Sequence, residues 1–259
     1  MAHIPSGPTA SLDVLTFRQA LASAETPNPD YDIRRWLYAP SFYSEYRYIL
    51  GTRGEKPLIC IGVNPSTAAP DHLDNTLKSV ERIALHNGYD SFLMFNVYAQ
   101  RSTDPDAMER QCNPALHREN LEAFRYILSL SPEPAVWAAW GAVIEKRAYL
   151  PACVRDFVTL GQSFGARWYC AGAISKKGHP HHPLYLRRDE ALRPFDIQNY
   201  LEAIVLNLSL HPISTAPPTG ANGSWPLRKP SSRTSSSCWE TYYTTAPETT
   251  FPGTTPPRR

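Results

Sequence analysis

Five residues suited to chemistry follow apolar runs in this 259-residue sequence, and they are Asn64, Asn96, Gly141, His179 and His182. An asparagine amide has both a donor and an acceptor, so Asn96 could read the edge of a planar, amide-like ligand. Asn64, with the backbone N–H groups beside it, could face the same ligand. A histidine near them could be catalytic or contact a base. The residue types therefore favour a site for a polar, planar molecule.

Each of these residues also has a purely structural interpretation. Asn64-Pro65-Ser66-Thr67 could be a turn followed by a helix cap, and Asn96 could tie two loops together. A histidine in a Pro-rich loop could simply be solvated. We expect no metal site, because His179, His181 and His182 have no further His, Cys or carboxylate at a suitable spacing.

A loop at Arg101-Ser102-Thr103-Asp104-Pro105 follows the run that Asn96 ends. The guanidinium of Arg101 could reach a phosphate, or it could be an ordinary solvated group. The residues expected to bind a base or another ligand are Pro65, Ser66, Thr67, Asn96, Arg101 and Gly141.

Short apolar runs must position these residues, and they cover 58–63, 92–95, 135–139 and 168–170. Bounded by Gly, Pro and Asn, such runs are typical of buried strands. Helical patterns lie between them, which favours parallel strands. Ligands bind beyond the carboxyl ends of parallel strands, so the candidate residues can converge on one site. A further strand is expected at Tyr46–Leu50, antiparallel at an edge.

The expected helices lie near 12–24, from Leu77 to the stop at Gly88, and over 116–130, 143–158 and 197–206, with Pro151 breaking the fourth. This order predicts a three-layer α/β/α sandwich with a mainly parallel central sheet. The compact domain is expected over 31–208. A flexible lead-in (1–30) precedes it, and a disordered tail rich in Pro, Ser and Thr (209–259) follows.

Composition narrows the class of protein. A net charge of +2 is no strong signature of nucleic-acid binding, although a local basic patch could exist. The five cysteines form no Cys-x-x-Cys pair and are interpreted as free thiols in a reducing compartment. No apolar run approaches the ~20 residues of a membrane span, and no secretory signal is recognisable. We expect a soluble intracellular protein, cytoplasmic or nuclear, without a cofactor.

Several motifs in combination resemble the domain of unknown function 1643 family. They are Tyr46-Arg47-Tyr48, Val63-Asn64-Pro65-Ser66-Thr67-Ala68, Asn96 with the 101–105 loop, Trp140-Gly141, and His179-Pro180 followed by His182-Pro183-Leu184-Tyr185-Leu186. The resemblance covers roughly Tyr46 to Tyr200.

The same motifs, in the same order, more distantly resemble the uracil-DNA glycosylase superfamily. Gly62-Val63-Asn64-Pro65 is similar to its Gly-Ile-Asn-Pro motif, in which the Asn positions the attacking water. Asn96 ends a strand similar to the one whose Asn reads the uracil edge. The segment at His179 to Leu184 is similar to the loop whose His stabilises the departing base. The Ser-Pro of that loop is absent here, so His179 and His182 both remain candidates.

This resemblance implies a glycosylase-like fold and a site for a nucleobase, with DNA or a nucleotide as the expected partner. Cleaving an N-glycosidic bond needs a positioned water and donors at the developing charge, which Asn64 and a His can supply. Leu184 and Tyr185 are candidate wedges into DNA, and the basic residues expected to contact phosphates are Lys176, Lys177, Arg187 and Arg188. These charges could equally be a solvated loop.

Three functions therefore remain open from the sequence: hydrolysis of an N-glycosidic bond, binding or modification of a nucleotide by other chemistry, and a non-catalytic interaction module. A glycosylase should keep a basic collar around its site. A small-nucleotide enzyme should show a closed pocket with one Arg. In an interaction module, the motif residues should have their hydrogen-bonding groups satisfied by other groups of the protein itself.

Overall fold

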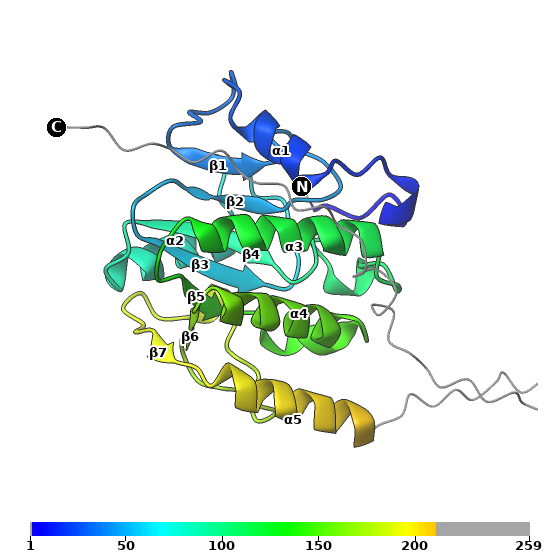
Figure 1. The fold of residues 1–259 in the computed structure, drawn as a ribbon, viewed down its shortest axis with the longest axis vertical. Coiled ribbons are helices and arrows are strands. Elements are labelled where there is room, and N and C mark those ends of the chain that lie inside the picture. The colour runs from blue at the N-terminus through cyan, green and yellow to red at the C-terminus, as the bar shows by residue number, and fades with distance from the viewer. Residues whose placement is uncertain (1, 211–259) are drawn as a thin grey trace, which may run out of the picture. The chain divides into compact units, whose positions relative to one another are not determined.

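The computed structural model describes residues 2–210, with side chains up to residue 204, and Figure 1 shows its ribbon. Seven strands form one sheet in the order β1-β2-β4-β3-β5-β6-β7. Their bounds are Trp36–Ala39 (β1), Ile49–Thr52 (β2), Pro57–Gly62 (β3), Ser91–Asn96 (β4), Ala135–Ala138 (β5), Arg167–Cys170 (β6) and Arg193–Pro194 (β7). The α-helices are Phe17–Ala24 (α1), Asn75–His86 (α2), Pro114–Ser129 (α3), Leu150–Ser163 (α4) and Ile197–Leu210 (α5).

The four central strands of the sheet are parallel. β3 pairs in parallel with β4 and β5, and β5 pairs in parallel with β6. Antiparallel strands flank them, with β1 and β2 on one side and β7 on the other. The prediction of a mixed α/β fold around a mainly parallel sheet is confirmed. The carboxyl ends of β3, β4, β5 and β6 consequently share one edge of the sheet.

The strand expected at Tyr46–Leu50 is shifted, and it is not at an edge. β2 covers Ile49–Thr52 and pairs antiparallel with both β4 and β1, so the edge strand is β1. β1 was not predicted, although Trp36–Ala39 is a short apolar run followed by Pro40, like the runs that were expected to be strands. The aromatic segment before β2 instead pairs with the loop after β4, through an antiparallel bridge between Tyr46 and Gln100.

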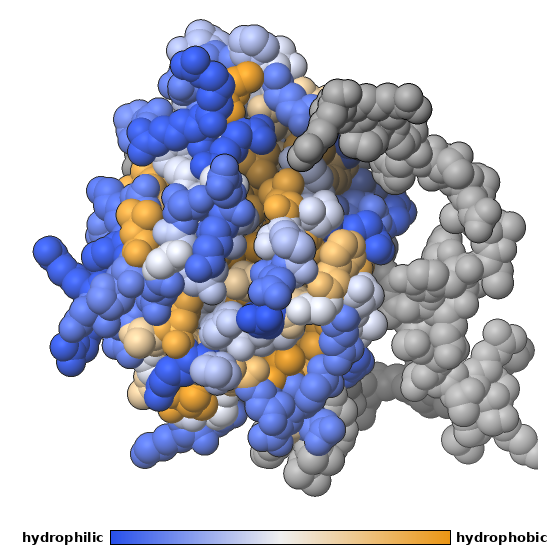
Figure 2. Space-filling model, turned by 60° about the vertical axis from the view of Figure 1, so that its left-hand side comes forward, coloured by the Kyte–Doolittle hydropathy of each residue, from blue (hydrophilic) through white to orange (hydrophobic). Residues whose placement is uncertain are grey.

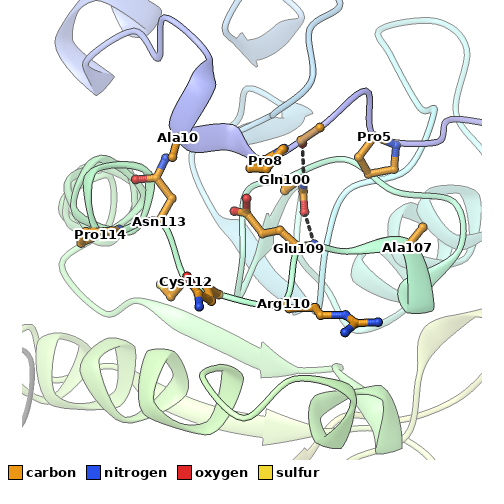
Figure 3. A pocket seen from close by; sticks show the side chains of 12 residues that line it. Pro5, Pro8, Ala10, Gln100, Ala107, Glu109, Arg110, Cys112, Asn113 and Pro114 are labelled. Carbon is orange, nitrogen blue, oxygen red and sulfur yellow. Dashed lines mark hydrogen bonds between the residues drawn. The ribbon is translucent and has the colours of Figure 1, made fainter. Parts of the chain in front are cut away.

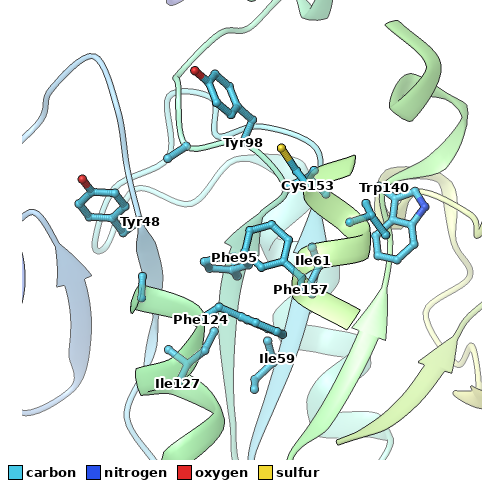
Figure 4. Packing of buried hydrophobic residues seen from close by; sticks show 14 of the residues in the cluster. Tyr48, Ile59, Ile61, Phe95, Tyr98, Phe124, Ile127, Trp140, Cys153 and Phe157 are labelled. Carbon is cyan, nitrogen blue, oxygen red and sulfur yellow. The ribbon is translucent and has the colours of Figure 1, made fainter. Parts of the chain in front are cut away.

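Helices cover both faces of the sheet. On one face a core cluster gathers side chains from α1, α3, α4 and α5, and its centre is the ring trio Phe95, Phe124 and Phe157, with centroids 5.1–5.2 Å apart (Figure 4). The second cluster, on the opposite face, gathers Leu77 and its neighbours on α2. Figure 1 shows α3 and α4 crossing in front of the sheet.

Two helix predictions are confirmed in detail. α2 begins where the Asp74 carboxylate accepts a hydrogen bond from the Leu77 N–H at 2.9 Å, and Gly88, with φ of 78°, lies just beyond its end. The helix expected over 143–158 is two pieces, a 3₁₀ helix at Gly141–Lys146 and α4, with Pro151 in the first turn of α4.

The described residues of the expected lead-in include α1, whose Phe17, Ala20 and Ala24 are buried in the first cluster. The tail expected at 209–259 lies outside the described residues apart from its first two, which belong to α5. Within residues 2–210, no helix combines the length and apolar character that a membrane crossing requires.

Candidate functional site

The sheet brings the predicted asparagines to neighbouring strand ends. In the parallel pairing of β3 with β4, Gly62 stands opposite Asn96. The chain then turns at Asn64, two residues beyond Gly62. β5 lies on the other side of β3, and Gly141 follows its end. Asn64, Asn96 and Gly141 therefore lie at one edge, as the parallel strands predict.

Asn64 is held firmly by the loop that follows β4. Its Nδ2 donates to the carbonyl of Ser102 at 2.7 Å and to that of Pro65 at 3.1 Å. The Ser102 N–H returns a bond to the Pro65 carbonyl at 2.8 Å. Both amide hydrogens of Asn64 are thus engaged. Its Oδ1, on a half-buried side chain, is the atom left to accept a hydrogen bond from a water or ligand.

Two arginines lie buried behind this loop because of how the strands pair. The bridge between Tyr46 and Gln100 is flanked by bonds from Arg47 N to Ala99 O and from Arg101 N to Glu45 O, at 2.9 and 2.8 Å. Residues on either side of a bridged pair point to the same face of a sheet. Arg47 and Arg101 consequently share one face, and they are 1% and 0% exposed.

The two guanidinium groups donate to neutral acceptors. Arg47 Nη1 donates to the Ala68 carbonyl at 3.1 Å. Arg101 donates to the carbonyls of Ser66 and Ala68 and, at 2.9 Å, to the hydroxyl of Tyr38. The ring of Tyr43 lies over Arg101, with 4.3 Å between the guanidinium carbon and the ring centroid.

Neither of these two positive charges has a carboxylate as an ion-pair partner within the described residues. In residues 2–210, no carboxylate lies within 4.0 Å of either group, and both Nε atoms lack a hydrogen-bond partner. Burial, and then the neighbouring Arg101 charge, lower the pKa of Arg47 to about 9. Burial also lowers the pKa of Arg101. Burying an ion without an ion-pair partner costs several kcal/mol. The two guanidinium groups therefore concentrate positive charge at this place in the fold.

The loop over the arginines has two backbone N–H groups without an acceptor in the described chain, those of Ser66 and Thr67. In a trans peptide, the N–H of a residue points opposite to the carbonyl before it. The Ser66 carbonyl faces Arg101, and the Pro65 carbonyl faces Ser102. The Thr67 N–H therefore points away from Arg101, and the Ser66 N–H points away from Ser102. Neither N–H has an acceptor within the described chain. The arrangement favours an anion in front of the loop.

Asn96 has the least satisfied side chain at this edge. It is 1% exposed, and neither its Nδ2 nor its Oδ1 has a hydrogen-bond partner. A methyl group at Gly62 would lie 3.2 Å from Asn96 Oδ1 and 2.6 Å from Met94 Cε, so the absence of a side chain there makes room for the amide. An unmade hydrogen bond of this kind costs about 1–3 kcal/mol, which is a reason to look for a ligand.

His179 is fully engaged within the protein. Its ring nitrogens lie 3.0 Å from the Tyr200 hydroxyl and 3.0 Å from Glu145 Oε1, and the side chain is 3% exposed. Glu145 also pairs with Lys177 at 2.7 Å, and hydrogen bonds to Lys177 and His179 lower its pKa. His179 therefore connects its loop to α5. No three His, Cys, Asp or Glu side chains within residues 2–210 are grouped to hold a metal ion.

In contrast to His179, His182 uses only one of its ring nitrogens in hydrogen bonds within the described residues. Its Nδ1 accepts from the Leu184 N–H at 3.3 Å, which places the proton of the neutral ring on Nε2 as an available donor. A methyl group at Gly141, whose φ is 61°, would lie 3.5 Å from His182 Cβ, so these two predicted residues are adjacent. Burial, and then the neighbouring His181, lower the pKa of His182, while Asp74 opposes that shift. Asp74 also acts electrostatically on Arg47.

This shift predicts a pH-dependent stability. The unfolded chain binds a proton on residue 182 near pH 6.5, whereas the folded protein resists it until lower pH. The free energy of unfolding should therefore fall as the pH drops below about 6.5. His182→Gln should flatten that decline in urea unfolding measured between pH 7.5 and 5.5. The exposed His86, changed to Gln, is the control, and an unaltered slope in His182→Gln would contradict the assignment.

The basic and apolar residues of the last loop lie at the surface. Leu184 and Tyr185 are 36% and 81% exposed, and Lys176, Lys177, Arg187 and Arg188 are exposed. Lys177 is paired with Glu145, and Arg187 with Asp189 at 3.1 Å. The face shown in Figure 2 has small hydrophobic areas divided by hydrophilic ones. The residues predicted to contact DNA are thus accessible to solvent. Two of the four basic side chains, Lys177 and Arg187, already have acidic partners.

A hollow of about 630 Å³ lies elsewhere, between the N-terminal segment and the chain leading into α3 (Figure 3). Its lining includes Pro5, Gln100, Glu109 and Cys112, and none of the predicted site residues.

The sequence analysis did not assign a role to Arg47 or Tyr43. The only signal for Arg47 in the sequence was a charge between two aromatic residues in a strand-like run.

Comparison with known proteins places this arrangement in a family. The family model for proteins of unknown function named DUF1643 matches residues 47–184, more than half of the chain. The matched stretch runs from Arg47 to Leu184 and so contains both arginines, both asparagines and His182. No curated protein and no solved structure gives a significant match. The chain belongs to the DUF1643 family.

Proposed function

We propose that the chain binds a nucleotide at the carboxyl ends of β3, β4 and β5. The observation that carries this proposal is the buried pair Arg47 and Arg101, which has no carboxylate partner within 4.0 Å in the described residues. The loop in contact with the pair leaves the N–H groups of Ser66 and Thr67 without an acceptor there. A phosphate in front of the loop would accept hydrogen bonds from those N–H groups and would compensate the charges of Arg47 and Arg101.

The unpaired side-chain amide of Asn96 indicates that the ligand carries a nucleobase at the end opposite its phosphate. Its amide has an unused donor and an unused acceptor, which is the pattern that pairs with the edge of a nucleobase. Asn96 and the loop at Ser66 follow neighbouring parallel strands, so one ligand of nucleotide size can engage both. A phosphate at one end and a planar amide-like edge at the other define a nucleotide.

A ligand panel tests this proposal. The full chain is titrated calorimetrically with inorganic phosphate, nucleosides and nucleoside 5′-monophosphates, one for each base. We expect at least one monophosphate to bind about 10-fold or more tightly than its nucleoside, and binding to weaken with added salt. Equal affinities for a nucleoside and its monophosphate would show that the arginine pair does not contribute to binding a phosphate.

Asn96→Leu separates base recognition from folding. Leucine has the same branched shape and leaves no unpaired polar atom, so the melting temperature of the unliganded protein should stay level or rise. Affinity for the preferred nucleotide should fall about 10-fold or more, because the base edge loses both hydrogen bonds. Met94→Leu, on the same face of β4, is the control. Unchanged affinity in Asn96→Leu would show that the amide does not contact the ligand.

A second candidate function is hydrolysis of an N-glycosidic bond, as in the uracil-DNA glycosylase superfamily. Two atoms favour it. Asn64 Oδ1 is fixed by the two bonds of its Nδ2 and remains open to orient a water. His182 Nε2 is a neutral donor that can stabilise a departing base anion, and the lowered pKa of His182 keeps the ring neutral at pH 7.

The exposed Leu184 and Tyr185 then serve as wedges into a duplex, next to Lys176 and Arg188. Oligonucleotides containing uracil, hypoxanthine or mismatches are incubated with the protein, and released base is measured. A glycosylase releases base from at least one of them. Nucleotide binding without base release from any oligonucleotide would leave the first proposal standing alone.

A further inference from the structure

We propose that residues 3–8 form a strap that holds the ring of Tyr43 closed over Arg101, and that release of the strap uncovers this arginine for an anion. The anion rests on the proposed function, whereas the strap does not. Arg101 is 0% exposed, but Tyr43 is 51% exposed, and its ring centroid lies 4.3 Å from the guanidinium carbon. Tyr43 therefore separates this charge from the solvent. An anion cannot contact the guanidinium group while the ring stays in place.

One residue of the strap, His3, holds the ring of Tyr43. The Tyr43 hydroxyl lies 3.0 Å from His3 Nδ1, and the two ring centroids are 5.6 Å apart in an edge contact. His3 Nε2 lies 3.4 Å from a carboxylate oxygen of Glu45. The His3 N–H donates to Thr103 Oγ1 at 2.8 Å, and the Thr103 N–H donates to the His3 carbonyl at 2.9 Å. His3 thus ties the ring to the loop that carries Arg101.

The ring of Tyr43 can move without disturbing the sheet. Tyr43 lies between the end of β1 at Ala39 and the bridge residue Tyr46, in a stretch that belongs to no helix or strand. A change of side-chain rotamer is enough to take a surface ring off the group beneath it. The contacts with His3 are consequently what keeps Tyr43 over Arg101.

The strap has a buried anchor behind it and a loosely held middle. Thr9 is buried, and its N–H and hydroxyl donate to the Glu109 carboxylate at 2.8 and 2.7 Å. Residues 2–8 form no helix or strand, and Pro5 and Pro8 border the hollow in Figure 3. A segment with few buried contacts opens at a lower free energy than the core does. The strap can therefore lift while Thr9 stays in place.

An oxyanion is the ligand that suits the uncovered arginine. Within the described residues, the guanidinium group of Arg101 has no ion-pair partner, and its Nε has no hydrogen-bond partner. Guanidinium groups bind phosphate and carboxylate oxygens through short, charge-assisted hydrogen bonds. Closing the ring over Arg101 hides this group from such anions, and opening it makes the group available.

Phenylglyoxal, which modifies guanidinium groups that solvent can reach, tests the strap without a nucleotide. The full chain is treated, digested with chymotrypsin and analysed by mass spectrometry, and the rate at Arg101 is compared with that at the exposed Arg34. We expect Arg101 to react slowly in the wild type. His3→Ala and Tyr43→Leu should each raise its rate about 10-fold or more, because a covered group reacts in proportion to the open fraction.

Two neighbours provide matched controls. Ile4→Ala changes an exposed residue of the strap, and Phe42→Leu changes the exposed ring beside Tyr43. Both should leave the rate at Arg101 unchanged. Wild-type Arg101 reacting as fast as Arg34, or an unchanged rate in His3→Ala, would overturn the strap. An equal rise at the buried Arg47 would show general loosening of the fold and would overturn it as well.

Inorganic phosphate, added to His3→Ala before the reagent, tests the anion separately. We expect phosphate to slow the modification of Arg101 and not that of Arg34. Faster modification in His3→Ala without protection by phosphate would support the strap, but it would overturn the anion's part in the proposal and contradict phosphate binding at this arginine.

Discussion

Replacing Arg47 or Arg101 by Met should weaken binding of the preferred nucleotide about 100-fold for each residue. A unit charge about 6 Å from a phosphate contributes ~3 kcal/mol at an effective dielectric constant near 20, and that energy corresponds to about two orders of magnitude in Kd. Isothermal titration calorimetry at fixed salt gives the comparison. Arg34→Met is the matched control, because the side chain of Arg34 is 89% exposed and its ion pair is with Asp32.

The same variants distinguish a binding role from a structural one. Arg47→Met removes a buried charge and its repulsion with Arg101, while the Ala68 carbonyl keeps its bond from Arg101. The unliganded protein should therefore melt at the same temperature as the wild type or higher. A drop of several degrees in Arg47→Met, with affinity unchanged, would show that the arginine pair holds the fold and not a ligand.

Under the second candidate function, Asn64→Ala should slow base release by about 10² to 10³ with little loss of affinity for the substrate. In that function the fixed Oδ1 would orient a water in the transition state, and removal of one preorganised group typically has an effect of this size. Single-turnover rates at saturating enzyme separate the chemical step from binding. His182→Gln should also slow the reaction.

Two variants guard that interpretation. Asn75→Ala changes an exposed amide at the start of α2 and should react at the wild-type rate. His179→Gln affects the bonds to Glu145 and Tyr200 and should chiefly lower the melting temperature. A rate in Asn64→Ala equal to that of the wild type would exclude a water-positioning role for Asn64.

Much of the fold followed from periodicity and from helix-terminal residues. The runs at 58–63, 92–95, 135–139 and 168–170 are strands of one sheet, and Gly88 and Pro151 mark helix boundaries as expected. β1 and β7 were not predicted. β1 is a four-residue apolar run of the same kind as β5 and was overlooked, whereas β7 has only two residues, both exposed, and so has no strand pattern.

The position of the candidate site could be predicted from the sequence, but the hydrogen bonds and side-chain contacts of its residues could not. Parallel strands and their end residues placed Asn64, Asn96 and Gly141 at one edge. Sequence left His179 and His182 equivalent, because only the tertiary contacts of Glu145 and Tyr200 show which histidine is engaged. The arginine pair depends on an antiparallel bridge between Tyr46 and Gln100, more than fifty residues apart. Local patterns do not reveal such long-range pairings.

The most direct test of nucleotide binding at this edge is a nitrogen-15 NMR titration of the full chain with the preferred nucleoside monophosphate. We predict saturable shifts of the Ser66 and Thr67 backbone amides and of the Asn96 side-chain amide, all with one Kd. The nucleoside alone should move Asn96 more than Ser66 and Thr67. Saturable shifts confined to residues around the hollow, such as Gln100 and Cys112, with Ser66, Thr67 and Asn96 unmoved, would contradict the account.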